Sequence, residues 1–404
     1  TILVTGVDII FFWVARMIFM SLHFMKEIPF KDVYIHGLVR DAQGRKMSKS
    51  LGNGVDPLEV IAKYGADTLR YTLITGQAPG YDQRFRFENV EAGRNFANKI
   101  WNASRFVLMN LEGNDPGSIS GNLSRHEHWI LDRYRKAVLE VTSFLEEYEL
   151  GEAARRLYDF IWSDFCDWYI ELSKIQLFGG SEQDKKRVLQ VLHHVLKGTL
   201  KLLHPFMPFI SEEIWQHLPG KGKESILATA SWPTAEASPK LEEKAQAFTH
   251  VMEVVKAIRF LRGEVALPPA KKAKVVLRVP EEYAALLREE EVVLKKLAFA
   301  EEVIFLQEGE EKPEKALTAL SGKIEVYLPL EGVVDIEGEI GRLQKELAEV
   351  EKDLVQVTRK LSNSQFVQKA PPQVVQKNQD KQEDLSMRRQ KLQERLQELT
   401  KLTR

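Results

Sequence analysis

The stretch "GRKMSKSLGN" at residues 44–53 gathers side chains that could hold a polyanion. Lys46 and Lys49 are three residues apart, Ser48 and Ser50 add hydroxyl donors, and glycine stands near each end. A lysine ammonium is a mobile point charge. Two of them suit a polyphosphate, on which negative charge grows as a nucleotidyl group is transferred. The spacing alone favours a solvated surface loop, so the interpretation depends on the surrounding sequence.

The segments on either side predict the elements that position this loop. An apolar run at 33–39 precedes it and indicates a strand. After it, Asp56 and Pro57 suit the N-cap and first position of a helix, and the pattern predicts that this helix covers 56–75. The expected order is therefore strand, mobile cationic loop, helix.

Length and composition allow several domains without a strong preference for a charged partner. The chain has 404 residues and 44% hydrophobic content, which predicts about two to four domains. Lys plus Arg number 57 against 58 Asp plus Glu, so an anionic partner must be met by local patches. Cys166 is the single cysteine. It excludes an internal disulfide and a Cys-rich zinc site, and fits a reducing cytoplasm.

One apolar stretch, residues 7–24, has roughly the length of a membrane span. Asp8, Arg16 and His23 interrupt it, and helices of this kind also occur in the cores of large proteins. The preceding "TILVTGVD" lacks the basic start of a signal peptide and reads as a buried strand entered in mid-domain. We therefore expect a core helix over 9–25, no membrane, and a chain that is a segment of something longer.

Four regions follow from the changing periodicity. Residues 1–85 alternate strands and helices, as at the end of a Rossmann-type parallel α/β domain. Residues 86–262 are helical almost throughout and predict a bundle. Residues 263–335 combine β-rich runs with a helical segment, which indicates a small α+β connector. Residues 336–404 are predicted as an antiparallel coiled coil. The fold class is multidomain and mainly α.

The last region has the clearest repeat in the chain. Apolar residues spaced alternately four and three form a heptad seam: Ile336, Ile340, Leu343, Leu347, Val350, Leu354, Val357 and Leu361. "KAPPQVV" then interrupts the helix, and a second helix carries Leu385, Leu392, Leu396 and Leu399. Residues 341–404 hold 14 Lys or Arg against 9 Asp or Glu. This excess indicates either solvated outer faces or an arm lying along a polyanion.

Within the predicted bundle, one helix face combines cations, an amide and an aromatic ring: Arg94, Asn98, Trp101 and Arg105. The opposite side is apolar and consists of Phe96, Ile100, Ala103, Val107 and Leu111. Unstacked RNA bases rest on aromatic and guanidinium planes, so the polar face suits single-stranded RNA. The alternative is a helix edge at which the tryptophan is partly buried.

Other conspicuous side chains receive structural interpretations. In "DFCDWYIELSK", four residues at helical spacing predict core packing, with Cys166 structural rather than reactive: Phe165, Trp168, Tyr169 and Leu172. The histidines His193, His194 and His204 lack carboxylates or cysteines at metal-ligand spacing. Core and capping roles are expected for them, and no protein-bound metal.

The full string "KMSKSLGN" resembles the signature loop of the class I aminoacyl-tRNA synthetases, and the chain most resembles the valyl-tRNA synthetase family. The similarity runs nearly end to end and rests on "VTGVDIIFFWVARM", "KMSKSLGNGVDP", "RNFANKIWNASRF", "DFCDWYIELSK", "HPFMPFISEEIWQHLP" and the C-terminal repeat. It implies that the helical region is an anticodon-binding domain and that the C-terminal arm contacts tRNA. Valine, ATP with Mg²⁺ and tRNA are the implied substrates, and a monomer is expected.

The resemblance also implies roles for individual residues. Lys46 and Lys49 would act catalytically on the phosphates of ATP. The implied ATP-binding set is Gly6, Asp8, His36, Gly37, Lys46, Met47, Ser48, Lys49 and Ser50. The acid of "GVD" would lie near the ribose, beyond the carboxyl end of a strand, where α/β sheets bind ligands. Asp8 can also be read as a helix N-cap. The resemblance also implies that the helical region 86–262 contacts the tRNA anticodon.

One departure limits the resemblance. No "HIGH"-type motif and no editing insertion occurs in these residues, so we expect both upstream and expect this chain alone to be inactive in valine activation. Two alternatives stay open. A fragment of the isoleucyl-tRNA synthetase type usually carries "DQ" and "GWF" where this chain has "DIIFFW", and commonly a cysteine-rich tail. A non-catalytic tRNA-binding protein on a synthetase scaffold would lack an upstream nucleotide-binding half.

Overall fold

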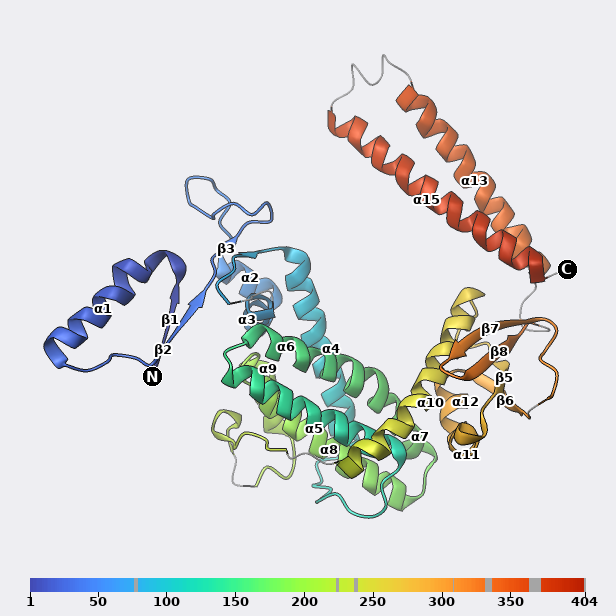
Figure 1. The fold of residues 1–404 in the computed structure, drawn as a ribbon, viewed down its shortest axis with the longest axis horizontal. Coiled ribbons are helices and arrows are strands. Elements are labelled where there is room, and N and C mark those ends of the chain that lie inside the picture. The colour runs from blue at the N-terminus through green and yellow to red at the C-terminus, as the bar shows by residue number, and fades with distance from the viewer. Residues whose placement is uncertain are drawn as a thin grey trace. The chain divides into compact units, whose positions relative to one another are not determined.

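The structure is a computed structural model of the chain, mainly helical with small sheets (Figure 1). It describes residues 1–75, 79–222, 225–235, 239–307, 309–330, 336–362 and 372–402. Contacts divide the chain into two compact units, Thr1–Thr249 and His250–Arg404. Each unit is described by itself below.

The first unit opens with a strand and an apolar helical segment. β1 (Ile2–Gly6) pairs in parallel with β2 (Asp32–His36). The segment between them consists of a 3₁₀ turn, two π-helical turns and a short α-helix: η1 (Val7–Ile9), η2 (Ile10–Val14), α1 (Ala15–Met20) and η3 (Ser21–Met25). By length and composition Val7–Met25 could cross a membrane.

Most of this apolar segment is exposed, which contradicts the expectation of a core helix over 9–25. Phe11 is 84% exposed, and Phe12 and Trp13 are each 62% exposed. Val14 is the buried residue of η2. Within the described chain, the pair β1 and β2 offers too little surface to cover a helical segment of this length.

The predicted strand at 33–39 is two strands rather than one. β2 ends at His36, and β3 (Val39–Arg40) pairs in parallel with β4 (Gln83–Arg84). The change of partner occurs at Gly37, where a Cβ would lie 1.8 Å from the carbonyl oxygen of Tyr81. The close approach of a second backbone, which a sequence pattern does not reveal, therefore ends the first strand.

The predicted helix at 56–75 is likewise interrupted. It forms α2 (Pro57–Tyr64) and α3 (Ala66–Thr75), separated by Gly65 at φ +92°. Glycine adopts this left-handed conformation without the penalty of a Cβ. The expected N-cap is confirmed, since the Asp56 carboxylate accepts a hydrogen bond of 2.8 Å from the backbone N–H of Leu58.

The predicted helical region is confirmed as helical. Its helices are α4 (Phe87–Leu111), α5 (Arg125–Glu146), α6 (Leu150–Asp159), the π-helical η4 (Phe160–Tyr169), α7 (Ile170–Gly179), α8 (Glu182–Leu203), α9 (Pro208–His217) and α10 (Pro239–Glu264), with the 3₁₀ turn η5 (Leu227–Thr229). Residues 112–124 separate α4 from α5, and Gly180 and Ser181 separate α7 from α8. The four residues of "DFCDWYIELSK" that were expected in the core are buried: Phe165, Trp168, Tyr169 and Leu172.

Polar caps join these helices to one another. Ser124 and Glu127 form a capping box at the start of α5, and the fully buried Glu127 carboxylate also accepts a hydrogen bond of 2.8 Å from Arg187 Nε on α8. The buried Asp67 of α3 accepts hydrogen bonds from the backbone N–H groups of Phe209 and Ile210 at the start of α9. This cap ties the α/β segment to the bundle.

The second unit contains a four-stranded sheet in the order β6-β5-β8-β7. The expected runs are β5 (Ala273–Arg278) and β8 (Ile324–Pro329), and the expected helical segment is α11 (Glu281–Glu289) with α12 (Glu291–Leu297). The sequence analysis did not identify β6 (Ala300–Leu306) and β7 (Ala316–Ser321). β6 pairs in parallel with β5, and β7 pairs antiparallel with β8.

Two long helices complete the chain, α13 (Ile336–Ser362) and α15 (Pro372–Leu402). They run antiparallel, since Glu346 pairs with Arg388 while Thr358 accepts from Gln382. Leu343, Val350 and Leu392 form a buried cluster between them, against which Leu347, Leu385 and Leu396 pack. The side chains of Ile336, Ile340 and Leu399 lie outside the described residues, as do residues 363–371. Of the predicted interruption "KAPPQVV", the part from Pro372 onward already belongs to α15.

Candidate functional site

The lysine-rich loop is built around one carboxylate that the sequence analysis did not select. Asp41 Oδ1 accepts hydrogen bonds from the backbone N–H groups of Gln43 (3.1 Å) and Arg45 (2.7 Å). Its Oδ2 accepts from Arg45 Nε at 2.7 Å and from Asn53 Nδ2 at 2.9 Å. The Asn53 amide, with Arg45, lowers the pKa of Asp41 to about 2. The carboxylate is therefore ionised and closes both ends of the loop.

Asn53 extends this frame into the signature residues. Its Oδ1 accepts a hydrogen bond of 2.9 Å from the backbone N–H of Ser48. Its Nδ2 reaches the carbonyl oxygen of Lys46 at 3.3 Å. Ser48 Oγ in turn lies 3.1 Å from Ser50 Oγ and accepts from the backbone N–H of Leu51. Two polar side chains of the loop thus order its backbone.

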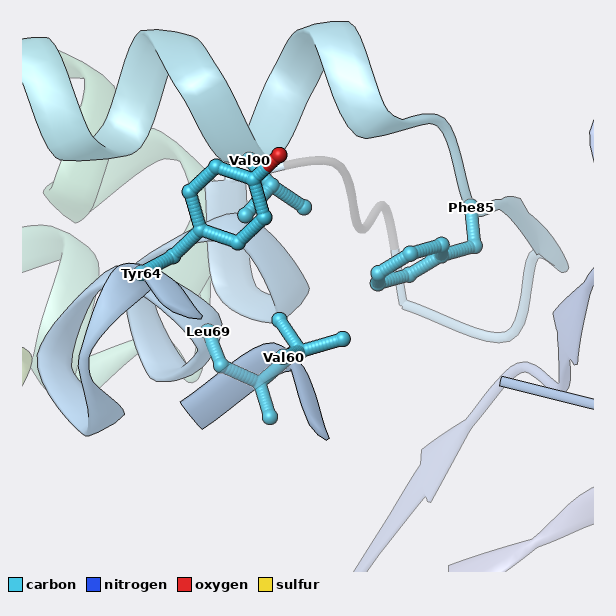
Figure 2. Packing of buried hydrophobic residues seen from close by; sticks show 5 residues of the cluster. All are labelled: Val60, Tyr64, Leu69, Phe85 and Val90. Atoms are coloured by element: carbon cyan, nitrogen blue, oxygen red, sulfur yellow. The ribbon is translucent and has the colours of Figure 1, made fainter. Parts of the chain in front are cut away.

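Met47 anchors the same loop to an apolar core. It packs against a buried cluster of five residues, Val60, Tyr64, Leu69, Phe85 and Val90, which Figure 2 shows seen from close by. The neighbouring Lys46 and Lys49 are both exposed, and in the part of the chain that the structure describes neither ammonium group is in an ion pair. Met47 thus points inward while Lys46 and Lys49 point outward. Both lysine ammonium groups are therefore free to approach an anion.

Asp82 fastens the strand that leads into the loop. Its Oδ1 accepts a hydrogen bond of 2.8 Å from the backbone N–H of Leu38, and its Oδ2 pairs with Arg40. Arg40 also forms an isolated antiparallel bridge with Lys46. Since Asp82 and Leu38 are 44 residues apart, this support comes from tertiary contact alone.

The structure brings together four of the other proposed ATP-binding residues at the carboxyl ends of β1 and β2. Gly6 is in register with His36, and a Cβ at Gly6 would lie 2.9 Å from Asp8 Oδ1 and 3.6 Å from His36 Cε1. Gly37 follows directly. Asp8 is not the N-cap, because Gly6 occupies that position and no side chain caps the turn. Among the described residues, no hydrogen bond or ion pair joins this group to the lysine loop.

The proposed RNA-binding face of α4 is exposed, and its apolar face is buried as expected. Trp101 is 42% exposed, and Asn98 and Arg105 lie beside it on the surface. Arg94 lies 5.8 Å from the ring centre of Tyr64 and donates to Asn95. The buried side consists of Phe96, Ile100, Ala103, Val107 and Leu111. Trp101 therefore lies on an exposed edge of α4 and not in the core.

Comparisons with known proteins agree with one another along the chain. Residues 1–86 match the family "tRNA synthetases class I (I, L, M and V)", and residues 127–277 match "Anticodon-binding domain of tRNA ligase". Residues 335–400 match "Valyl tRNA synthetase tRNA binding arm". A valine–tRNA ligase of Carboxydothermus hydrogenoformans is 53% identical over 94% of this chain. The chain belongs to the valyl-tRNA synthetase family.

Other relatives have the same description. A valine–tRNA ligase of Geobacillus kaustophilus is 49% identical over 98% of the chain. The chain spans 43% and 45% of the lengths of these two relatives, so it matches less than half of a valyl-tRNA synthetase. A solved ternary complex of LeuRS, tRNA and LeuAMS from Agrobacterium radiobacter is 21% identical, with a TM-score of 0.47, and covers 76% of this chain and 37% of that one.

The single cysteine is buried, and each of the three histidines noted in the sequence contacts a neighbouring residue. Cys166 is buried, and burial raises its thiol pKa to about 12, which makes it a poor nucleophile. His193 Nε2 lies 2.9 Å from the Pro219 carbonyl, and His204 Nδ1 lies 2.9 Å from Ser211 Oγ. His194 packs edge-on against Tyr134. Among the described residues, no cluster of three or more His, Cys, Asp or Glu could hold a metal.

The sequence analysis did not identify Asp41 and Asn53, the two side chains that hold the loop. For Asp41 the sequence does contain a local indication. Asp41, three residues before Gly44, is a common start for a turn in which the side chain accepts backbone hydrogen bonds. Asn53 lies 12 residues from Asp41, and no periodicity relates them. Only the folded loop shows that these two side chains meet.

Proposed function

We propose that this chain is the C-terminal portion of a valine–tRNA ligase, which couples valine to its tRNA with ATP. The relatives that are about half identical over nearly the whole chain support this assignment. The observation that carries it at the site is the loop that Asp41 frames and Met47 anchors, with Lys46 and Lys49 left exposed. The backbone of such a loop is held in place, while its two lysine side chains are free to move toward a ligand.

The proposed chemistry is transfer of an adenylyl group to the valine carboxylate. The carboxylate attacks the α-phosphorus, and the bond to the leaving pyrophosphate breaks. Lys46 and Lys49 would stabilise the negative charge that grows on pyrophosphate, with Mg²⁺ carried on the nucleotide. Met47 positions the loop, and Ser48 and Ser50 hold its backbone or donate to phosphate oxygens.

The adenosine part of ATP would bind beyond β1 and β2. Gly6 permits close approach at the strand end, and the Asp8 carboxylate suits ribose hydroxyls as an acceptor. His36 and Gly37 would form the adenine edge. The grouping of these residues at the carboxyl ends of two parallel strands supports this assignment, because α/β sheets bind nucleotides at that edge.

The remaining regions would bind tRNA. In this proposal the α/β segment covers 1–85, the anticodon-binding bundle 86–262, the connector 263–335 and a coiled-coil tRNA-binding arm 336–404. The exposed Arg94, Asn98, Trp101 and Arg105 of α4 would contact unpaired bases. The net positive charge of the arm suits a polyanion.

The apolar segment Val7–Met25 would be covered in the complete enzyme. Its aromatic side chains are exposed here, and the relatives are more than twice as long as this chain. We propose that it packs within a complete nucleotide-binding fold that also supplies the "HIGH"-type motif and the editing domain. The enzyme would then be a cytoplasmic monomer, and this chain alone would not activate valine.

The lysine assignment is tested in the complete ligase by valine-dependent pyrophosphate exchange. Lys49→Ala is expected to lower the rate constant of exchange by 10-fold to 1000-fold, because charge stabilisation of this kind is realised in the transition state. Lys31→Ala, an exposed lysine that precedes β2, is the matched control. An equal rate in both variants would contradict the lysine assignment. Rapid exchange by the 404-residue chain alone would contradict the proposal that this chain does not activate valine by itself.

The tRNA assignment is tested with the chain itself. Labelled valine tRNA is titrated over a salt series, beside a tRNA with a changed anticodon. Phosphate contacts predict that the logarithm of the affinity falls linearly with the logarithm of the salt concentration. Weaker binding of the changed tRNA supports anticodon recognition. Equal binding of both tRNAs would mean that only the basic arm contacts tRNA. The assignment of the bundle as an anticodon-binding domain would then be wrong.

A further inference from the structure

The turn between α5 and α6 holds a tyrosine in a backbone conformation that usually belongs to glycine. Tyr148 has a φ of +61°. Its backbone N–H donates to the Leu145 carbonyl oxygen at 3.2 Å. The next backbone N–H, that of Glu149, donates to the Phe144 carbonyl oxygen at 2.8 Å. These two hydrogen bonds make the end of α5 a Schellman motif, in which the left-handed residue is usually glycine. A side chain as bulky as tyrosine is strained there, because its Cβ crowds the backbone.

This strained tyrosine contacts the strand that leads to the proposed adenine edge. Tyr148 Oη donates a hydrogen bond of 3.3 Å to Asp32 Oδ2, at the start of β2. The ring centre of Tyr148 lies 6.4 Å from that of Tyr34 on the same strand. Aromatic pairs and hydrogen bonds both stabilise a contact, so they offset the cost of the left-handed backbone. Asp32 and Tyr148 are 116 residues apart, and the contact therefore joins the bundle to the α/β segment.

The contacted residues share one face of β2 with His36. Side chains alternate between the two faces of a strand, so Asp32, Tyr34 and His36 lie on the same face. At a rise of about 3.3 Å per residue, the Cα of His36 lies about 7 Å beyond that of Tyr34. In the part of the chain that the structure describes, β2 has one neighbouring strand, β1. The turn at Tyr148 is thus a second support for the strand that carries His36.

We propose that Tyr148 is a positioning residue for ATP, which holds β2 against the bundle and so fixes His36 and Gly37 at the adenine edge. The inference rests on the proposed function and deepens it, because it gives the bundle a part in the nucleotide site. The strain supports this assignment. A residue that only ended α5 would cost less as glycine, whereas the contact with β2 requires the tyrosine ring.

Three variants separate the ring, the hydroxyl group and the backbone strain. Tyr148→Gly removes the ring and the strain together. Tyr148→Phe keeps the ring and removes the hydrogen bond to Asp32. Glu112→Gly is the matched control, because Glu112 is an exposed residue at the end of α4 with a φ of +50°. Among the described residues, no hydrogen bond, ion pair or ring contact joins Glu112 to β1 or β2.

Amide hydrogen exchange, followed by mass spectrometry on the 404-residue chain, measures the support of β2. Exchange in peptides that cover 32–36 should be about tenfold faster in Tyr148→Gly and about threefold faster in Tyr148→Phe, because lost contacts raise the population of the opened strand. Glu112→Gly should exchange in these peptides as the unsubstituted chain does. Circular dichroism checks that the variants fold, which is expected because glycine relieves the strain and phenylalanine preserves the ring.

Valine-dependent pyrophosphate exchange in the complete ligase then tests the role in ATP binding. Tyr148→Gly should raise the KM for ATP by about threefold to tenfold and leave kcat and the KM for valine within about twofold. A merely structural role would reduce the amount of active enzyme, and thus the apparent kcat, without changing the KM for ATP.

Two results would overturn the positioning role alone: an equal KM for ATP in Tyr148→Gly and Glu112→Gly, or unaltered hydrogen exchange of β2 in both Tyr148 variants. The proposed function would fail separately, through absence of valine-dependent exchange in the unsubstituted ligase. The hydrogen exchange of β2 does not depend on that activity, so the two failures are distinguishable.

Discussion

Gly37 shows at the residue scale why β2 ends at His36 and the chain then pairs with a different strand. A Cβ at this position would lie 1.8 Å from the carbonyl oxygen and 2.2 Å from the carbonyl carbon of Tyr81. Neither atom is at the end of a flexible side chain, so the backbone itself would have to move. The pairing of β3 with β4 depends on this approach.

Gly37→Ala is therefore expected to destabilise the first unit by about 2–3 kcal/mol, in the range of severe point mutations. Urea unfolding followed by circular dichroism measures the change in free energy. Gly54→Ala is the control, since a Cβ there meets no atom within 4 Å. Equal midpoints for the two variants would contradict the close approach.

Glu127 is the second residue whose environment gives a definite prediction. Its side chain is fully buried and accepts hydrogen bonds from Arg187 Nε and from the backbone N–H of Ser124. Glu127→Gln removes the charge and leaves the Arg187 guanidinium, which is 15% exposed, with one carboxylate partner, Asp184. Breaking a buried pair in this way costs about 3–5 kcal/mol.

The free energy of unfolding of Glu127→Gln in urea should fall by about that amount. Glu182→Gln serves as the comparison, because Glu182 is 89% exposed and its pair with Lys185 lies on the surface. A surface pair contributes about 0–1 kcal/mol. If both variants unfold at the same midpoint, the buried pair does not stabilise the bundle.

At the scale of elements, the lysine loop depends on a polar frame and an apolar anchor. Asp41 and Asn53 hold its two ends, and Met47 attaches it to the cluster in Figure 2. Asp67 then fixes α3 to the start of α9, the helix that with α4 lines a cavity beside Trp101. The lysine loop and the proposed RNA-binding face are thus carried by helices that contact one another directly.

Asp41→Asn should loosen the loop without unfolding the chain. The neutral amide keeps one acceptor but presents its NH₂ group to donors, Arg45 Nε and Asn53 Nδ2. We expect trypsin to cleave after Arg45, Lys46 or Lys49 about tenfold faster, since local opening exposes the backbone. Mass spectrometry of timed digests measures the rate.

Asp56→Asn is the control for that substitution, because asparagine caps a helix about as well as aspartate. Its digestion rate in the loop should equal that of the unsubstituted chain. If Asp41→Asn is cleaved no faster than this control, the carboxylate does not frame the loop.

At the scale of the whole molecule, buried histidines set the response to acid. Burial lowers the pKa of His193, and lowers that of His126 to about 4. These side chains are neutral in the fold. In the unfolded chain they take up protons near the ordinary value of 6.5. The unfolded state therefore binds more protons between these values, and stability falls as pH falls from about 6.5 toward 4.

His126 alone should remove about 2 kcal/mol between pH 7 and pH 5, since its folded form stays neutral over that interval. Thermal unfolding followed by circular dichroism at pH 7, 6 and 5 measures the trend. His126→Phe cannot titrate and should show a smaller decrease in melting temperature over the same interval. A decrease as large as in the unsubstituted chain would assign the pH dependence to other groups.

The sequence by itself determined features that depend on neighbours in the chain. The Asp56 cap, the buried face of α4 with Phe96 and Val107, and the seam with Leu343 and Val350 follow from local preference and helical period. The signature motifs indicated the family, which the comparisons confirmed.

Tertiary structure decided the features that depend on contacts between distant residues. The division of the run at 33–39 follows from Tyr81, and the frame of the loop follows from the meeting of Asp41 with Asn53. The exposure of Val7–Met25 also depends on contacts between distant residues. The same is true of the cavity that α4 and α9 form. Periodicity gives the face on which a side chain lies. It does not give the partner that the fold brings to that face, because that partner is set by packing across the whole molecule.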